Sequence, residues 1–287
     1  MIPYPQIKKN KYNAGLYVVS TPIGNMNDIT LRAIDVLSQS KYILCEDTRV
    51  SKKLMEKFKI KSILISNHKF NERKNINKII EILKLGNIVS LISDAGTPGI
   101  SDPGNILINS CVAENISIYP VPGSSALTAA ASISGFSEKI FFYGFFPQKE
   151  KDLKRDLDLL SKIDCAIVFF ISPNKINKNI EVIKKYFSGK KILICREISK
   201  FYEEYIRIAV DELKPFIKKP KGELTIVISP HIKEKNESKI LNESVKIKIN
   251  KMIKKKSIKD IVQKISGEEE ISKKIIYKYC LTLKNEN

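Results

Sequence analysis

The chain alternates short apolar runs with longer stretches in which apolar residues recur every three or four positions. The short runs are typical of buried strands, and the longer stretches are typical of amphipathic helices. Over residues 1–122 this alternation predicts an α/β domain, with Asn27 or Asp28 as the cap of the first helix. The predicted strands are 16–20, 42–45, 63–66, 88–92 and 116–121, and the predicted helices begin near 28 and span 50–58, 75–85 and 105–114.

The pattern changes from residue 140 onward, where an aromatic run opens a second set of elements. Its strands and helices no longer alternate strictly, which predicts a mixed α/β domain with antiparallel members. We place the domains at 1–122, 123–230 and 231–287. The predicted strands are 141–147, 165–171, 192–195, 205–210 and 223–229, and the predicted helices are 149–161, 176–187 and 211–218.

The segment after Pro230 is rich in lysine. It holds fifteen lysines against eight acidic residues and no arginine. Two short amphipathic helices are predicted at 258–266 and 271–283, joined through 267–270. Such a tail suits a small nucleic-acid-binding appendage, and it equally suits a solvated terminus.

Length and composition describe a globular chain. Its 287 residues can form two domains that each bury a core, and 43% hydrophobic residues exclude global disorder. No apolar run approaches the ~18 residues needed to cross a membrane, and no secretory signal is visible over residues 1–11. Five widely spaced cysteines, no CxxC and two histidines suggest neither a disulfide framework nor a metal site. We therefore expect a cytoplasmic protein without a bound metal.

The net charge of +19 favours a polyanionic partner. Lysine outnumbers arginine by 44 to 6, so a general bias toward lysine also explains the charge. The few arginines are notable because a guanidinium can bind phosphate through two parallel hydrogen bonds, which lysine cannot do. They are Arg32, Arg49, Arg73, Arg155, Arg196 and Arg207.

The stretch Ser93–Gly104 (SDAGTPGISDPG) is the most unusual in the chain. It follows the predicted strand 88–92 and contains three glycines and two prolines in twelve residues. Such a composition excludes the interior of a strand or helix and lets the backbone approach a ligand closely. Because ligands bind at the carboxyl ends of strands in α/β sheets, we interpret this stretch as a ligand loop. For Asp94 and Asp102 within it, a role in the chemistry and a role in orienting the loop backbone are equally open.

Similar loops follow the neighbouring strands. Residues 21–25 form a Pro/Gly turn, residues 46–49 form the polar cluster EDTR, and residues 122–125 combine Pro and Gly with two serines. Neither GxGxxG nor a P-loop is present, which disfavours a dinucleotide or ATP site. The EDTR cluster favours function, although Asp47 or Thr48 could simply cap the next helix.

Five stretches together resemble the tetrapyrrole-methylase-like (class III) S-adenosylmethionine methyltransferases. Within that family they are most similar to the branch that methylates a cytidine 2′-hydroxyl in bacterial small-subunit ribosomal RNA. The similarity covers about residues 15–229, and EDTR together with SDAGTPGISDPG is very specific to this branch. The stretches are LYVVSTPIGNMNDITLR at 16–32, EDTR at 46–49, LISDAGTPGISDPG at 91–104, VPGSSAL at 121–127 and FFPQK at 145–149.

The resemblance implies a kidney-shaped pair of α/β domains with S-adenosylmethionine in the cleft between them, usually as a homodimer, followed here by a small helical tail. It implies backbone contacts to the methionine part of the cofactor and an apolar contact beside them. The implied cofactor residues are Pro22, Ile23 and Gly24 near the transferred methyl, Asp94, Ala95, Gly96 and Thr97 at the methionine part, Ile100 as the apolar contact, and Ser125 with Ala126.

Five positions, four of them in the second half, depart from the pattern of this branch. The positions that differ are Asn67 for a Tyr or His, Ile171 and Asn174 within a Glu-Ser-Pro-His-Arg-like run, Tyr202 for a His, and Ile208 for a Gly. These changes leave the expected cofactor loops intact. They put the contacts with the substrate in doubt.

The expected reaction is an in-line attack of a ribose 2′-oxygen on the sulfonium methyl. A ribose hydroxyl is a weak nucleophile at neutral pH, so a nearby base should help. Asp47 or Glu46 is our first choice for that base. Arg49 could hold a phosphate beside the target nucleotide, with Arg32 and Arg196 as weaker candidates.

The resemblance makes 16S ribosomal RNA, within the small ribosomal subunit, the expected partner. Two other functions stay open at this stage. One is a small-molecule methylase of the tetrapyrrole type, which the basic charge and EDTR disfavour. The other is an RNA-binding ribosome-assembly protein without turnover. Methyl transfer to RNA would separate the expected function from both.

Overall fold

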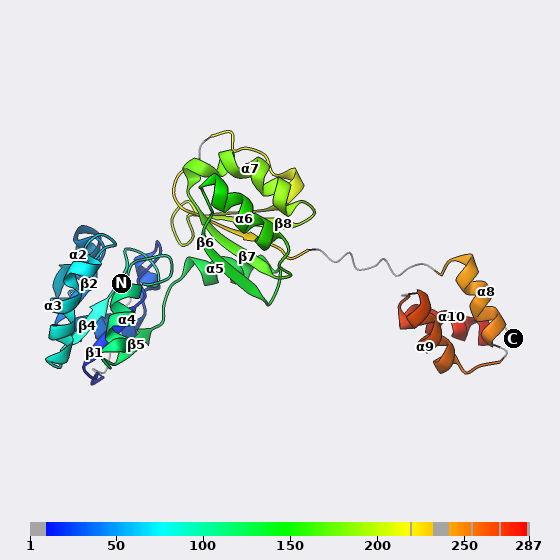
Figure 1. The fold of residues 1–287 in the computed structure, drawn as a ribbon, viewed down its shortest axis with the longest axis horizontal. Coiled ribbons are helices and arrows are strands. Elements are labelled where there is room, and N and C mark those ends of the chain that lie inside the picture. Colours follow the sequence, from blue (N-terminus) through cyan, green and yellow to red (C-terminus); the bar gives the residue numbers. More distant parts are fainter. Residues whose placement is uncertain (1–9, 219, 232–240, 254, 270, 286–287) are drawn as a thin grey trace. The chain divides into compact units, whose positions relative to one another are not determined.

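The computed structural model describes residues 10–218, 220–231, 241–253, 255–269 and 271–285 (Figure 1). These residues form two compact units, one ending at Pro230 and one beginning at His231. The first unit contains two five-stranded sheets, and the second is helical. No helix of the described part has the length and apolar character needed to cross a membrane.

The first sheet is entirely parallel, in the strand order β3-β2-β4-β1-β5. All five predicted strands of this region are confirmed, with small shifts at their ends. Because every strand runs the same way, all of their carboxyl ends lie at one edge of the sheet. The strands are β1 (Gly15–Val19), β2 (Tyr42–Cys45), β3 (Ile63–Ser66), β4 (Ile88–Leu91) and β5 (Ile118–Val121).

Helices cover both faces of this sheet. Buried side chains of α1 and α2 pack with Tyr17 and Ile43, whereas those of α3 and α4 pack with Leu16 and Leu44. Neighbouring strand residues thus face opposite cores, which explains why the strands read as continuous apolar runs. The helices are α1 (Leu31–Gln39), α2 (Thr48–Lys57), α3 (Glu72–Lys84) and α4 (Asn105–Ala113).

The predicted cap of α1 is wrong. Residues Met26–Asp28 form a short 3₁₀ helix, and Thr30 caps α1 by accepting a hydrogen bond from the backbone N–H of Ala33 at 3.1 Å. The apolar spacing starts before the helix does because the preceding 3₁₀ turn and Ile29 already pack toward the core.

The second sheet is mixed, in the order β6-β7-β10-β8-β9. Only β6 and β7 pair in parallel, and the other neighbours are antiparallel, as predicted. Helices α6 and α7 cover one face, and α5 covers the other. The elements are α5 (Ala126–Ser134), β6 (Ile140–Phe145), α6 (Glu150–Ser161), β7 (Ala166–Ile171), α7 (Pro173–Phe187), β8 (Lys191–Arg196), β9 (Glu204–Ala209) and β10 (Leu224–Ile228).

The helix predicted at 211–218 is wrong. Only a short 3₁₀ helix is present there, at Val210–Glu212. Pro215 disfavours a helix at this position because it lacks an N–H and restricts the residue before it. Instead, the Asn177 side chain of α7 bonds both to the N–H and to the carbonyl of Phe216, each at 3.0 Å, and so holds this segment against α7.

The C-terminal unit contains three helices among its described residues, whereas two were predicted. Val245 and Ile249 of α8, at an i, i+4 spacing, join a core with Ile261 and Ile276 that was not recognised from the sequence. Helix α9 continues through Gly267, so the predicted linker there is also wrong, although residue 270 lies outside the described residues. The helices are α8 (Glu243–Ile253), α9 (Ile258–Glu269) and α10 (Lys273–Asn285).

Candidate active site

The loop Ser93–Gly104 lies at the centre of the edge where the strands of the first sheet end. Thr21, which follows β1, forms a pair of backbone hydrogen bonds with Gly96, at 2.8 and 3.1 Å. The Thr21 hydroxyl also donates to the carbonyl of Ser93 at 3.1 Å. The loop after β4 is therefore fixed to the loop after β1 through its backbone.

The loops after β2 and β5 are attached to the same stretch. The backbone N–H of Asp47 donates to Asp94 Oδ1 at 3.1 Å. The hydroxyl of Thr97 lies 2.8 Å from that of Ser20 and donates to the Ser124 carbonyl at 3.4 Å. Four loops that are distant in the sequence thus form one preorganised wall.

Two glycines of this loop are required by its geometry. Gly96 has φ +83°, a conformation that residues with a side chain rarely adopt. Gly104 has φ +134°, and a Cβ there would lie 2.8 Å from Leu91 Cδ2. These positions explain the glycine-rich composition that identified the loop.

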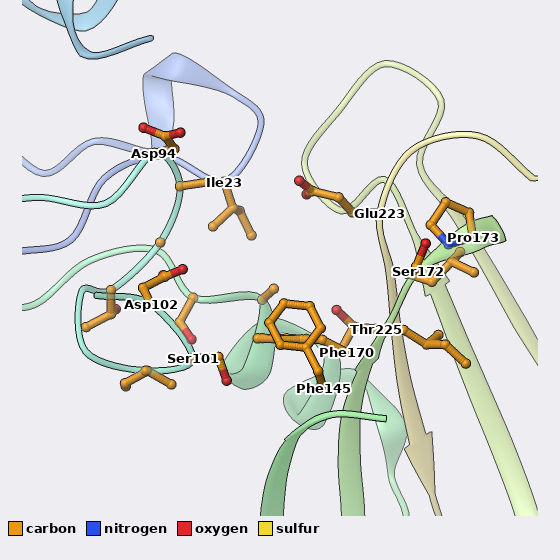
Figure 2. Close-up of a pocket in the computed structure, with 18 residues that line it drawn as sticks. Ile23, Asp94, Ser101, Asp102, Phe145, Phe170, Ser172, Pro173, Glu223 and Thr225 are labelled. Carbon is orange, nitrogen blue, oxygen red and sulfur yellow. The ribbon is translucent and has the colours of Figure 1, made fainter. Parts of the chain in front are cut away.

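A cavity of about 420 Å³ lies against this wall, within the ~300–1,000 Å³ typical of small-molecule sites (Figure 2). The structure brings together at this cavity most of the residues predicted for the cofactor: Ile23, Asp94, Ala95, Gly96, Thr97, Ile100, Ser125 and Ala126. Pro22 and Gly24 line a smaller adjoining cavity of about 200 Å³, which shares Ile23, Asp94 and Ala95 with the first.

The opposite wall comes from the second half of the unit, and sequence reasoning missed it. Figure 2 shows Phe145, Phe170, Ser172 and Glu223 across the cavity from the loop. A register shift between Phe142 and Gly144 distorts β6 just before Phe145, as is common beside active sites. The aromatic strand and the Ser-Pro pair that begins α7 were visible in the sequence, but not which of their residues face the cavity.

The position Ile171, which departs from the expected branch pattern, also lines this wall. The departures at Asn174, Tyr202 and Ile208 lie outside the lining of both cavities. Asn67 is buried, and its side-chain amide has no hydrogen-bond partner among the described residues.

The hairpin loop between β8 and β9 borders the smaller cavity. Lys200 lines that cavity and forms ion pairs with Glu197 at 2.9 Å and Glu223 at 3.1 Å. Gly24 lies so close to Lys200 that a Cβ would be 2.4 Å from Lys200 Cγ. The Ser199 hydroxyl donates to Asp28, which ties this loop to the first half.

In the EDTR turn, Asp47 is the cap of α2. Asp47 Oδ1 accepts a hydrogen bond from the backbone N–H of Arg49 at 2.8 Å, and Arg49 Nη2 lies 2.6 Å from Asp47 Oδ2. These hydrogen bonds lower the pKa of Asp47 to about 2. The Arg49 side chain is 88% exposed, and neither residue lines the cavities. The capping alternative is therefore confirmed for Asp47.

Three other carboxyl groups at this edge have the opposite shift. Burial is the main cause that raises the pKa of Glu46, Asp94 and Asp102. The effect is largest for Asp102, whose pKa is raised to about 6 by burial and by the charges of neighbouring carboxylates. The site therefore combines an apolar cavity, a backbone wall and one carboxyl group that titrates close to neutral pH.

The remaining candidates are held within the protein or lie apart from the cavities. Arg32 donates to the Pro120 carbonyl at 2.8 Å, and Arg196 pairs with Glu204 at 2.8 Å. Over the described residues, no group of three or more His, Cys, Asp or Glu side chains is arranged to hold a metal ion.

Residues 15–214 match the family model of the Tetrapyrrole (Corrin/Porphyrin) Methylases. Several relatives carry the name "Ribosomal RNA small subunit methyltransferase I". The proteins from Mesomycoplasma conjunctivae and Thermotoga maritima are each 42% identical, over 77% and 75% of this chain and 93% and 97% of their own. The protein from Neisseria meningitidis is 34% identical over 94% of both chains.

Solved structures show the same fold at lower identity. The methyltransferase CobJ covers 76% of this chain and 94% of its own, with a TM-score of 0.58 and 16% identity. Uroporphyrin-III C-methyltransferase from Thermus thermophilus, complexed with S-adenyl homocysteine, covers 74% of this chain and 96% of its own. Its TM-score is 0.52 at 15% identity.

Proposed function

We propose that this chain, which belongs to the tetrapyrrole methylase family, transfers the methyl group of S-adenosylmethionine to the 2′-oxygen of a cytidine ribose in 16S ribosomal RNA. The observation that carries the proposal is the similarity to relatives named for one activity. That similarity reaches 42% identity and covers most of each chain. The match to the family model, over residues 15–214, includes the loops that surround the cavity.

The cavity suits the methyl donor in chemistry as well as in size. Its wall at Ala95–Thr97 is formed by backbone that Thr21 holds in place. Polar groups of this backbone can bond to the methionine part of the donor. Ile100, Phe145 and Phe170 provide apolar contacts. We assign the donor to this cavity, with Ser125 and Ala126 beside it and Pro22–Gly24 near the methyl group.

When bound, S-adenosylmethionine supplies a methyl group that is already activated by its sulfonium. The chain's own contribution is to hold the acceptor oxygen in line with that methyl and to exclude water. Such positioning alone supplies a large part of the rate acceleration in bimolecular reactions. The target nucleotide must leave its stack to reach the cavity, as in other enzymes that act on single nucleotides.

The RNA side of the proposal uses residues of the turn after β2 and of the hairpin between β8 and β9. Arg49 stays 88% exposed although Asp47 orients its guanidinium, so it can bind a phosphate beside the target nucleotide. Glu46 lies near it at the end of β2. Phe201 and Tyr202 are 90% and 68% exposed on the hairpin that carries Lys200, where they can stack on unpaired bases.

The C-terminal unit adds positive charge to the chain. Its described residues carry eleven lysines against four acidic residues. This excess supports the interpretation of the unit as a nucleic-acid-binding appendage. A chain that ends at Pro230 should keep its affinity for S-adenosylhomocysteine and require more RNA for half-maximal rate. An unchanged RNA requirement would favour the solvated terminus instead.

We also propose that the protein is a homodimer that acts on the small ribosomal subunit. Exposed Ile133, Ile140 and Phe141 lie beside a second, shallower cavity of about 780 Å³ formed mainly by α5 and the start of β6, which supports association through this apolar region. Light scattering during size-exclusion chromatography measures the mass directly. A monomer at micromolar concentration would remove this part of the proposal.

The deciding experiment measures transfer of labelled methyl from S-adenosylmethionine to three acceptors. These are small subunits that lack the modification, protein-free 16S RNA, and a tetrapyrrole. We expect label in the small subunits with the wild type. The control is Ala126→Trp, whose side chain fills the cavity. This variant should give no label, whereas label made by a co-purifying enzyme would persist.

Each other outcome identifies an alternative. Label in the tetrapyrrole alone would support a small-molecule methylase. Cofactor binding without label in any acceptor would support an RNA-binding assembly protein without turnover.

A further inference from the structure

Asp102 is the carboxyl group best placed to act on an acceptor inside the cavity. It lines the cavity two residues after Ile100, and Figure 2 shows its side chain on the side opposite Glu223. Ser101 has φ +65°, and its Oγ approaches Gly144 of β6, where a Cβ would lie only 3.2 Å away. The end of the loop therefore lies close to β6, which places Asp102 near the junction of the two walls.

The surroundings of Asp102 favour a carboxylate that accepts protons. Its partly buried carboxyl hydrogen-bonds to Ser93, and the charged groups around it are Glu46 after β2, Asp94 in the same loop and Glu223 before β10. All three are acidic, and among the residues that the structure describes no lysine, arginine or histidine forms an ion pair with Asp102. Burial, together with these charges, raises the pKa of Asp102 to about 6, close to the value at which a general base works best near neutral pH.

The other carboxylates of the site are less suitable. Asp47 is paired with Arg49 outside the cavity, and its pKa of about 2 makes it a weak base. Glu223 is paired with Lys200 at 3.1 Å, and Asp94 accepts the backbone N–H of Asp47. Glu46 does not line the cavity.

We propose that Asp102 is the general base that removes the proton from the acceptor hydroxyl, an inference that rests on the proposed function. The ribose oxygen forms a bond to the donor's methyl carbon while the carbon–sulfur bond breaks and leaves its electron pair on sulfur. The hydroxyl proton passes to the Asp102 carboxylate and from there to water. The products are the 2′-O-methyl ribose, S-adenosylhomocysteine and a released proton.

The test compares single-turnover methyl transfer by wild type, Asp102→Asn and Asp102→Glu between pH 5 and pH 9, with the donor saturating. The wild-type rate should rise tenfold per pH unit up to about pH 6 and then level off. Asp102→Asn should lose this inflection and fall by about 10²–10⁴-fold on the plateau. Asp102→Glu should recover part of the rate. Asp158→Asn, an exposed position on α6, is the matched control and should follow the wild type.

Two readouts are independent of turnover. In protein labelled with ¹³C at aspartate carboxyls, one signal should titrate at about pH 6 and be missing in Asp102→Asn. Calorimetry should give similar S-adenosylhomocysteine affinity for both proteins, which shows that the cavity is intact.

Three outcomes would overturn the proposal. The first is an Asp102→Asn variant that keeps the wild-type rate and inflection, while the wild type still methylates RNA. The second is a selective loss of affinity for S-adenosylmethionine over S-adenosylhomocysteine with the inflection retained, which would make Asp102 a partner of the sulfonium charge. The third is a wild type that transfers no methyl to RNA, which would remove the proposed function and this role together.

Discussion

The turn that carries Asp47 and the loop that carries Asp102 follow neighbouring parallel strands, yet they give the same side chain opposite properties. Asp47 is half-buried in the turn after β2, where it caps α2 and pairs with the exposed Arg49, which lowers its pKa to about 2. Asp102 is partly buried at a cavity among other carboxylates, and its pKa rises to about 6. Position after a strand therefore does not identify a base, whereas the partners of the carboxyl group do.

The difference arises from local sequence in one case and from tertiary structure in the other. Arg49 lies two residues after Asp47, so their ion pair forms within one turn of chain. Asp102 instead acquires its environment from β2, from its own loop and from the residues before β10. We infer that the first aspartate positions an arginine and that the second serves the chemistry.

The largest expected effect is a loss of cofactor affinity at the cavity that Asp102 lines. Ala126→Trp places an indole in a space of about 420 Å³. Because the loops around it are fixed to one another, we expect the affinity for S-adenosylhomocysteine to fall by about 100-fold or more. Calorimetry measures it, and Ala113→Trp on the exposed side of α4 is the control. Unchanged affinity would move the cofactor site elsewhere.

Arg49→Ala tests whether the turn that carries Asp47 binds an RNA phosphate through Arg49. Loss of one phosphate contact should raise the RNA concentration for half-maximal rate by about 10-fold and reduce the slope of log affinity against log salt by about 1. The rate at saturating RNA should stay near that of the wild type. Arg155→Ala removes an exposed arginine of α6 and serves as the control. A large loss of the saturated rate would instead place Arg49 in the chemistry.

Asp102→Asn should make the protein more stable at neutral pH. The folded pKa of about 6 lies above the ordinary value of 3.8, so the folded state binds more protons between these values. The wild type therefore loses stability as pH rises from about 4 to 6, and the loss persists above pH 6. We expect the variant's Tm to exceed that of the wild type by about 3 °C at pH 8 and to match it near pH 4. A lower Tm of the variant at pH 8 would contradict the assigned environment.

Asp47→Asn should have the smallest effect, with the opposite sign. Asparagine keeps the helix cap but loses the charge that pairs with Arg49. The folded pKa of about 2 lies below the ordinary 3.8, so the ion pair stabilises the protein above pH 4, and this contribution disappears as the pH falls toward 2. A slightly lower Tm at pH 7 that converges with the wild type in acid is expected. If the Tm values of variant and wild type converged near pH 6, the pKa of Asp47 would be raised as we assign for Asp102, which would contradict the comparison.

Much of the fold was predictable because its strands are continuous apolar runs, whose burial on both faces is visible in the sequence. The ligand loop was predictable from its Gly/Pro composition after a strand, and Ile23, Ala95, Ile100 and Ser125, which the resemblance implied, do lie at one cavity. The helix predicted at 211–218 failed because Pro215 disfavours it, and Asn177, distant in sequence, binds Phe216 instead. The domain boundaries and the roles of the site residues stay predictions.

The second wall of the cavity and the base could not be predicted. Which face of β6 and β10 meets the loop depends on strand order and on the register shift before Gly144, neither of which periodicity contains. The raised pKa of Asp102 depends first on its burial in the folded protein and then on the charges of Glu46, Asp94 and Glu223, and periodicity contains none of these. Asp47 was preferred for its polar neighbours, and those same neighbours make it a cap and an ion pair.

The central claim is that the protein transfers a methyl group to an RNA hydroxyl at this cavity, with a carboxylate as the base. It is tested most directly by locating the transferred methyl group. Small subunits treated with the wild type and labelled S-adenosylmethionine are digested to nucleosides and analysed by mass spectrometry. The account predicts that the label appears in 2′-O-methylcytidine and fragments with the ribose. Label that fragments with the cytosine base would contradict it.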